Sequence, residues 1–210
     1  AVLVSGSGTN LQALIDAQER ESVAYSIQLV VSNESDAFAL QRAQLAGISS
    51  VVVNHQDYAS RQQFDEALAG VIEESRVQFV VLAGFMRRLT SSFVERFFTR
   101  LINIHPSLLP AHPGLNTHRK ALVAGDLEHG CSIHYVTEVL DGGPVIAQFA
   151  LSVLPGDDEE SLQKRVLQLE HRWLWRVLNQ IVLGHVKYVE GVVLYRGVIN
   201  VQSPEEFFCS

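Results

Sequence analysis

Short β-rich runs alternate with helical patterns through the first half of the chain. The predicted strands cover residues 1–4, 26–31, 51–53 and 79–82, and the predicted helices cover 9–18, 36–46 and 57–75. We expect Asp57 to be the N-cap of the third helix. This alternation is typical of βαβ units on a parallel sheet, whose right-handed crossovers bring the carboxyl ends of the strands to one edge. Open α/β sheets bind ligands at that edge, so we expect functional residues directly after strands.

The second half of the chain departs from this alternation. A short strand at 102–106 is stopped by proline, and a loop rich in proline and histidine follows. The remaining predicted elements are a hairpin-like pair of strands at 132–136 and 145–153, a helix at 158–181 and a last strand at 192–195. The prediction is an α/β fold with a Rossmann-like, open, mostly parallel sheet flanked by helices and an antiparallel C-terminal portion.

Composition narrows the class of protein. The chain has 210 residues, 47% of them hydrophobic, so it can bury a core, and we expect a single domain over 1–210. A formal net charge of −7 disfavours general nucleic-acid binding. Cys131 and Cys209, the two cysteines, lack the spacing of a zinc site or of a secreted disulfide framework, which indicates reduced thiols in a cytoplasmic protein. No apolar run approaches the ~20 residues of a membrane helix, so we expect no membrane association.

A glycine-containing loop, Ser5-Gly-Ser-Gly-Thr-Asn10, joins the first predicted strand to the first predicted helix. Its glycines allow a ligand to approach the backbone closely, and the free N–H groups at the helix start suit an anion, with Thr9 and Asn10 as extra donors. Leu11 stands where a dinucleotide fingerprint has its third glycine. The loop alone leaves three interpretations open: a plain turn, a site for phosphate or phosphosugar, and a site for NAD.

Asn103 and His105 lie on the strand that opens the second half. Side chains alternate along a strand, so the two point to the same face. The amide of Asn103 can donate a hydrogen bond to a developing oxyanion, and the imidazole of His105 can move a proton or, when charged, stabilise that oxyanion. For His105 taken alone, a structural histidine satisfied by a loop is the alternative.

Asp141 begins the turn Asp141-Gly-Gly-Pro144 between the hairpin strands. The glycines allow the chain to curl the carboxylate back towards a pocket, and a carboxylate beside an imidazole fixes its tautomer and favours its cation. An ordinary Asp-Gly hairpin turn is the alternative.

Three smaller features remain. The segment Phe85-Met-Arg-Arg-Leu89 combines apolar side chains with cations and suits a flat heteroaromatic ligand that carries carboxylates, although a surface turn fits equally. Glu170 falls within the apolar stripe of the last long helix, where its carboxylate must meet a partner or reach solvent. His112, His118 and His129 form no helical i, i+4 pair, so a metal site is not expected.

Together these segments resemble the phosphoribosylglycinamide formyltransferases, also called GAR transformylases, which are folate-dependent enzymes of purine synthesis. The resemblance covers almost the whole chain through Ser5-Gly-Ser-Gly-Thr-Asn-Leu11, Ala83-Gly-Phe-Met-Arg87, Asn103-Ile-His-Pro-Ser-Leu-Leu-Pro110, His134-Tyr-Val-Thr137 and Asp141-Gly-Gly-Pro-Val-Ile146. The central string with a downstream Asp-Gly-Gly is highly specific to formyl-folate transferases. The resemblance implies the formyltransferase fold, with phosphate or nucleotide binding in the N-terminal half and catalysis and folate binding in the C-terminal half.

The resemblance also implies roles for individual residues. The catalytic trio would be Asn103, His105 and Asp141, with Ser132 and His134 in support. The ribose-linked phosphate of glycinamide ribonucleotide (GAR) would bind at Gly8, Thr9 and Asn10, and its ribose or amine would lie near Glu170. The formyl-folate would contact Arg61, Met86, Arg87, Arg88, Leu89, Asn103, Thr137, Glu138, Val139, Leu140 and Asp141. No metal is implied.

The implied reaction transfers the formyl group of the co-substrate 10-formyltetrahydrofolate to the amine of GAR, giving formyl-GAR in de novo purine biosynthesis. The amine would attack directly, Asn103 and protonated His105 would stabilise the tetrahedral oxyanion, and Asp141 would support His105. A formyltetrahydrofolate hydrolase-like enzyme and a non-catalytic module that binds folate or phosphosugar are the alternatives. The expected partners are therefore two small molecules, and the sequence leaves monomer and homodimer open.

Overall fold

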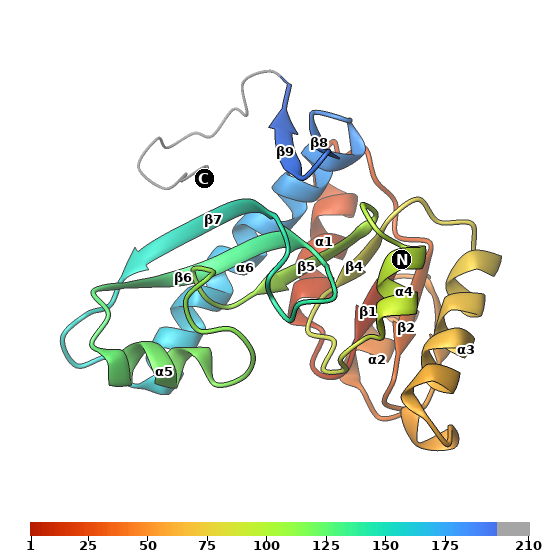
Figure 1. Cartoon of the computed structure of the whole chain (residues 1–210), viewed down its shortest axis with the longest axis horizontal. Helices are drawn as coiled ribbons and strands as arrows, with labels where there is room; N and C mark the ends of the chain where they lie inside the picture. Colours follow the sequence, from red (N-terminus) through yellow and green to blue (C-terminus); the bar gives the residue numbers. More distant parts are fainter. Residues whose placement is uncertain (197–210) are drawn as a thin grey trace. The chain divides into compact units, whose positions relative to one another are not determined.

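The computed structural model describes residues 1–196 (Figure 1). Contacts cluster in two units, the first covering residues 1–103 and the second beginning at Ile104. Strand β5 (Leu101–His105) carries the chain from the first unit into the second. Cys131 is a free, buried cysteine, and Cys209 lies outside the described residues.

The first unit is built on parallel strands. They are β1 (Val2–Val4), β2 (Leu29–Ser32), β3 (Ser49–Val52), β4 (Val80–Leu82) and β5, in the spatial order β3-β2-β1-β4-β5. The central strand β1 pairs on both sides, since Leu3 lies opposite Val31 of β2 and Leu82 of β4. The order of the strands reverses between β1 and β4, and such a reversal opens a crevice for ligands at the carboxyl ends of the strands. The parallel sheet predicted from the sequence is confirmed.

Helices cover both faces of this sheet. They are α1 (Thr9–Arg20), α2 (Phe38–Leu45), α3 (Arg61–Glu74) and the short α4 (Ser91–Arg96). Helix α1 contacts α2, and α3 contacts α4; Figure 1 shows the two pairs on opposite faces of the sheet. Because both faces are covered, β1, β2 and β4 are buried along their whole length, as their apolar runs predict.

The predicted start of the third helix is wrong. Helix α3 begins at Arg61, and its N-cap is Ser60, whose hydroxyl accepts the N–H of Gln63 at 3.2 Å. Asp57 instead ends a separate 3-10 helix, η1 (His55–Asp57), whose N-cap Asn54 accepts the N–H of Gln56. Two capping side chains within seven residues therefore divide what the sequence pattern joined.

The second unit contains an antiparallel pair, β6 (Glu128–Tyr135) and β7 (Val145–Ser152), with Cys131 opposite Phe149. Helix α6 (Glu159–Val182) packs on both strands, and its Trp173 ring stacks on Phe149 at 4.4 Å between centroids. Helix α5 (Thr117–Ala124) also contacts α6. The predicted hairpin-like pair and long helix are confirmed, whereas α5 was not predicted.

Local capping explains where α6 begins. The carboxylate of Asp158 accepts the N–H of Ser161 at 2.8 Å, and the Ser161 hydroxyl accepts the N–H of Asp158 at 2.9 Å, which together form a capping box. After α6 the chain forms a hairpin of β8 (Val186–Val189) and β9 (Val192–Tyr195). Across residues 1–196, no helix combines the length and apolar character needed to cross a membrane.

Candidate active site

The loop after β1 has the geometry of an anion-binding turn. Gly8 is the N-cap of α1 with φ of 68°, and a Cβ at this position would lie 2.5 Å from the Cβ of Ala39. The N–H of Ala39 donates to the carbonyl of Gly6 at 3.0 Å, which holds the loop against α2. The first turn of α1 carries no acidic residue, so the positive end of the helix is not neutralised there. Only a glycine meets both the backbone and the packing requirement at position 8.

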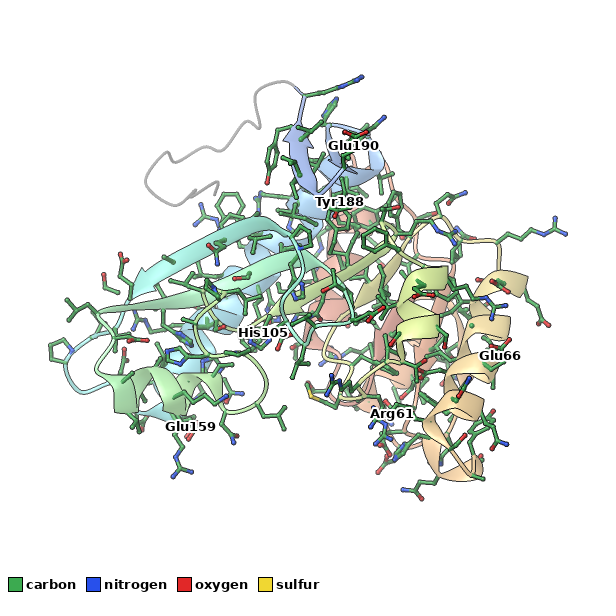
Figure 2. The ribbon with its side chains drawn as sticks, in the orientation of Figure 1. Arg61, Glu66, His105, Glu159, Tyr188 and Glu190 are labelled. Carbon is green, nitrogen blue, oxygen red and sulfur yellow. The ribbon has the colours of Figure 1, made fainter. Side chains whose placement is uncertain are left out.

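The loop after β4 supplies cations and exposed apolar surface. Within residues 1–196, the guanidinium groups of Arg87, Arg88 and Arg61 form no hydrogen bond or ion pair. Met86 is 65% exposed, and Figure 2 shows Arg61 at the start of α3. Unpaired guanidinium groups on a chain of net charge −7 suit the carboxylates of an anionic ligand.

In the second unit, His105 is held between two hydrogen-bond acceptors. It lies at the end of β5, as Figure 2 shows, and is only 6% exposed. Its Nε2–H donates to the carbonyl of His112 at 3.0 Å, and its Nδ1 lies 3.5 Å from Oδ2 of Asp141. A carbonyl can only accept, so Nε2 of His105 carries the proton of this hydrogen bond, and Nδ1 is the ring nitrogen turned towards the Asp141 carboxylate.

The turn that carries Asp141 directs its carboxylate inward. Asp141 has φ of 51°, a left-handed conformation that aspartate tolerates, and its side chain is 8% exposed. Oδ2 of Asp141 accepts the N–H of Gly114 at 2.7 Å. A Cβ at Gly143 would lie 1.8 Å from the carbonyl oxygen of Tyr135, so this position requires glycine. The Asp-Gly-Gly sequence is therefore needed both for the turn and for the placement of the carboxylate beside His105.

His134 lies on the other oxygen of Asp141. Its Nδ1–H donates to the carbonyl of Tyr135 at 2.9 Å, and its Nε2 is 3.8 Å from Oδ1 of Asp141, too far for a hydrogen bond. Burial lowers the pKa of His134, which keeps its ring neutral near pH 7. Asp141 thus lies beside two imidazole rings, one near each of its carboxylate oxygens.

Ser132 anchors the segment that presents the His112 carbonyl. Its hydroxyl donates to the carbonyl of Ser107 at 2.7 Å and accepts the N–H of Leu109 at 3.0 Å. The amide of Gln148 on β7 donates to Ser132 Oγ at 2.8 Å and to the Leu109 carbonyl at 2.7 Å. In turn, the Ser107 hydroxyl donates to the carbonyl of His112 at 3.2 Å. The sequence pointed to Ser132 and, within the central string, to Ser107. It did not point to Gln148, whose contact with Ser132 depends on the pairing of β6 with β7.

The loop between β6 and β7 leaves apolar side chains uncovered. Val139 is 66% exposed and Leu140 is 51% exposed, directly before Asp141. The hydroxyl of Thr137 donates to the Val139 carbonyl at 3.5 Å, and Glu138 is exposed. Exposed apolar side chains next to a buried carboxylate are available for contact with a flat ligand.

Glu170 is buried on α6 with 6% exposure, so the interpretation of a solvent-reaching carboxylate is wrong. It lies close enough to Cys131 to add to the effect of burial, and both raise the pKa of that thiol. Cys131 therefore stays a protonated, inert thiol.

Three further histidines come together in the second unit. His112 Nε2 lies 2.5 Å from Oδ2 of Asp126, and a 3.1 Å hydrogen bond joins His118 Nδ1 and His129 Nε2. The rings of His112 and His129 are 6.2 Å apart. Among the described residues, no three His, Cys, Asp or Glu side chains are arranged to hold a metal ion.

This cluster predicts that acid destabilises the protein. Burial, with a smaller contribution from the charges of His118 and His112, lowers the pKa of His129 to about 4. At His129, the unfolded chain takes up a proton near pH 6.5 and the folded chain does not. The contribution of neutral His129 to the free energy of unfolding is therefore fully present above pH 6.5 and is lost as the pH falls towards 4. We expect the free energy of unfolding to fall by about 1–2 kcal/mol between pH 7 and pH 5 through His129, after allowance for solvent screening. Urea titrations of the wild type and of His129→Gln at both pH values measure this difference.

The control for this prediction is His185→Gln, because His185 is exposed. His129→Gln is expected to flatten the pH dependence, and His185→Gln is expected to leave it unchanged. Equal slopes for wild type and His129→Gln would contradict the assignment.

Comparisons with known proteins identify the family of the chain. The profile of the formyl transferase family matches residues 1–178. The phosphoribosylglycinamide formyltransferase of Escherichia coli is 45% identical over 196 residues, which cover 93% of this chain and 92% of that protein. A solved structure of the phosphoribosylglycinamide formyltransferase of Coxiella burnetii superposes with a TM-score of 0.89 at 46% identity, covering 92% of this chain and 91% of the other.

The chain also matches one part of longer proteins. The trifunctional purine biosynthetic protein adenosine-3 of Drosophila melanogaster is 47% identical over 186 residues, which cover 88% of this chain but only 14% of that protein. The chain therefore spans about a seventh of the length of such relatives. The match to the family profile and the near full-length match to the bacterial enzyme establish that the chain belongs to the formyl transferase family.

Proposed function

We propose that this chain transfers the formyl group of 10-formyltetrahydrofolate to the amine of glycinamide ribonucleotide, giving formyl-GAR in de novo purine biosynthesis. The observation that carries the proposal is the placement of His105 between the His112 carbonyl and the Asp141 carboxylate. An imidazole held in this way can donate a hydrogen bond to the tetrahedral oxyanion through which direct formyl transfer passes. The near full-length bacterial relative, a phosphoribosylglycinamide formyltransferase, supports GAR as the acceptor.

In the proposed reaction the neutral amine of GAR attacks the formyl carbon. The lone pair of the amine forms a C–N bond to that carbon, and the π electron pair of the formyl C=O moves onto its oxygen. The Nδ1–H of His105 is not tightly committed to Asp141 at 3.5 Å, so it can donate to the oxyanion together with the Asn103 amide. The oxygen then re-forms the C=O bond as the bond from carbon to N10 of the folate breaks, and N10 keeps the electron pair of that bond. The proton lost by the attacking nitrogen reaches N10 through Asp141 and water.

The remaining candidate residues are assigned to the two substrates. Gly8, Thr9 and Asn10 bind the phosphate of GAR at the positive end of α1, and Glu170 lies near its ribose or amine. The cations Arg61, Arg87 and Arg88 attract the carboxylates of the folate. The flat ring of the folate contacts apolar and backbone groups of two loops. These groups belong to Met86, Leu89, Thr137, Glu138, Val139 and Leu140.

One assay separates this proposal from its alternatives. 10-Formyltetrahydrofolate is supplied with and without GAR, and the release of tetrahydrofolate is followed. Release only in the presence of GAR is the expected result. Release without GAR indicates a hydrolase, and no release under either condition indicates a binding module.

Gly8→Ala is expected to weaken GAR binding. The new Cβ would meet Ala39 at 2.5 Å in a conformation with positive φ, so the phosphate loop must shift. We expect the KM for GAR to rise about tenfold or more, since 1.4 kcal/mol of lost binding corresponds to that factor. The matched control is Gly6→Ala, because a Cβ at Gly6 meets nothing within 4 Å. A KM for GAR that is equal in the two variants would remove Gly8 from the site.

A further inference from the structure

Ser5 connects the loop after β1 with the loop after β4. Its main-chain N–H donates to the carbonyl of Gly84 at 3.1 Å. Its hydroxyl oxygen accepts the N–H of Met86 at 2.7 Å and lies 2.5 Å from Oδ1 of Asn33. Ser5 begins the phosphate loop in sequence, yet two of its contacts hold the loop assigned to the folate.

The direction of these hydrogen bonds follows from the chemistry of Glu34. Nδ2 of Asn33 lies 3.0 Å from Oε1 of Glu34, and a carboxylate can only accept. The amide nitrogen of Asn33 must therefore face Glu34, and its oxygen must face Ser5. Since that oxygen also only accepts, the single hydroxyl hydrogen of Ser5 is donated to Asn33. A lone pair of Ser5 is then left to accept the N–H of Met86.

The other end of the folate loop is held in a similar way. Oδ2 of Asp65 accepts the N–H of Thr90 at 2.6 Å, and Asp65 is buried with 2% exposure. The segment between Met86 and Thr90 is thus fixed at both ends by a buried or partly buried side chain. Because both ends of the segment are fixed, the segment that carries Arg87 and Arg88 loses less conformational entropy when a ligand binds.

We propose that Ser5 is a positioning residue for the folate subsite. It acts on this subsite through its hydrogen bond with the Met86 backbone, and Asn33 and Glu34 orient the Ser5 hydroxyl. This inference rests on the proposed function only in the identity of the ligand. Ser5 itself contacts neither the formyl group nor the amine of GAR in the proposed reaction. Its effect is on the affinity for folate rather than on the chemical step.

Calorimetric titration of the full chain with tetrahydrofolate tests the proposal. Ser5→Ala removes both the acceptor for Met86 and the donor to Asn33. We expect affinity for tetrahydrofolate to fall about tenfold, which corresponds to about 1.4 kcal/mol and lies within the range for loss of these two hydrogen bonds. In steady-state assays the KM for 10-formyltetrahydrofolate is expected to rise by the same factor, whereas kcat changes less than about threefold. The matched control is Ser7→Ala in the same loop, since Ser7 is exposed and is expected to leave folate affinity unchanged.

Two conservative variants separate positioning from general damage to the fold. Ser5→Thr keeps the hydroxyl and is expected to restore most of the affinity. Glu34→Gln keeps an acceptor oxygen for Asn33 and is expected to stay close to wild type, whereas Glu34→Ala is expected to lose about threefold. The proposal would be overturned if Ser5→Ala and Ser7→Ala bound tetrahydrofolate with equal affinity. It would also be overturned if Ser5→Thr bound tetrahydrofolate as weakly as Ser5→Ala. Tetrahydrofolate binding is measured without GAR. The binding test of Ser5 therefore keeps its meaning even if the wild type transfers no formyl group to GAR.

Discussion

His105→Ala is expected to lower kcat/KM for formyl transfer by about 100-fold or more, as loss of a donor to an oxyanion usually does. The imidazole occupies the gap between the His112 carbonyl and the Asp141 carboxylate, and alanine leaves no donor there. Because the lost interaction is made mainly in the transition state, kcat is expected to fall more than the KM values rise. Steady-state kinetics with each substrate varied in turn measure this division.

The control is His185→Ala, which removes an exposed imidazole from the same unit and is expected to keep wild-type kinetics. Titration with tetrahydrofolate shows whether His105→Ala still binds ligand and hence still folds. Wild-type turnover in a folded His105→Ala protein would remove His105 from the mechanism.

Asp141→Asn is expected to cost about 100-fold in kcat as well. The amide keeps the shape of the side chain and can still accept the N–H of Gly114, but it loses the negative charge beside Nδ1 of His105. It also cannot take up the proton released by the amine. The expected signature is a large fall in kcat with little change in tetrahydrofolate affinity.

The matched control is Asp126→Asn. Asp126 also lies beside a histidine, with 2.5 Å between its Oδ2 and Nε2 of His112, but this ring has no assigned role in the reaction. We expect Asp126→Asn to keep turnover within about threefold of wild type, on the scale of an ordinary partly exposed ion pair. Equal losses in Asp126→Asn and Asp141→Asn would indicate a general electrostatic effect rather than a specific carboxylate.

The sequence pattern was sufficient for the parallel strands β1, β2 and β4 because they are buried along their whole length and read as short apolar runs. It also located α6, whose apolar stripe and Asp158 cap are local features. The family, read from the Asn103 to Pro110 string, is confirmed by the profile match. The single domain, the cytoplasmic location and the roles of the site residues stay predictions.

Local patterns were insufficient where structure depends on distant contacts. Helix α5 begins at Thr117, inside a stretch whose prolines and histidines indicate a loop, and it is stabilised by packing on α6. The hydrogen bonds of Gln148 depend on the register of β6 with β7, which places Gln148 opposite Ser132. The left-handed φ of Asp141 and the 2.7 Å contact from Gly114 are likewise products of tertiary structure.

The path of the formyl carbon distinguishes transfer to GAR from hydrolysis. 10-Formyltetrahydrofolate labelled with carbon-13 in the formyl group is incubated with GAR and the full chain, and the products are analysed by NMR. For direct transfer, we expect the label to appear in the new amide of formyl-GAR in step with the tetrahydrofolate released. Label recovered as free formate while GAR stays unmodified would contradict it.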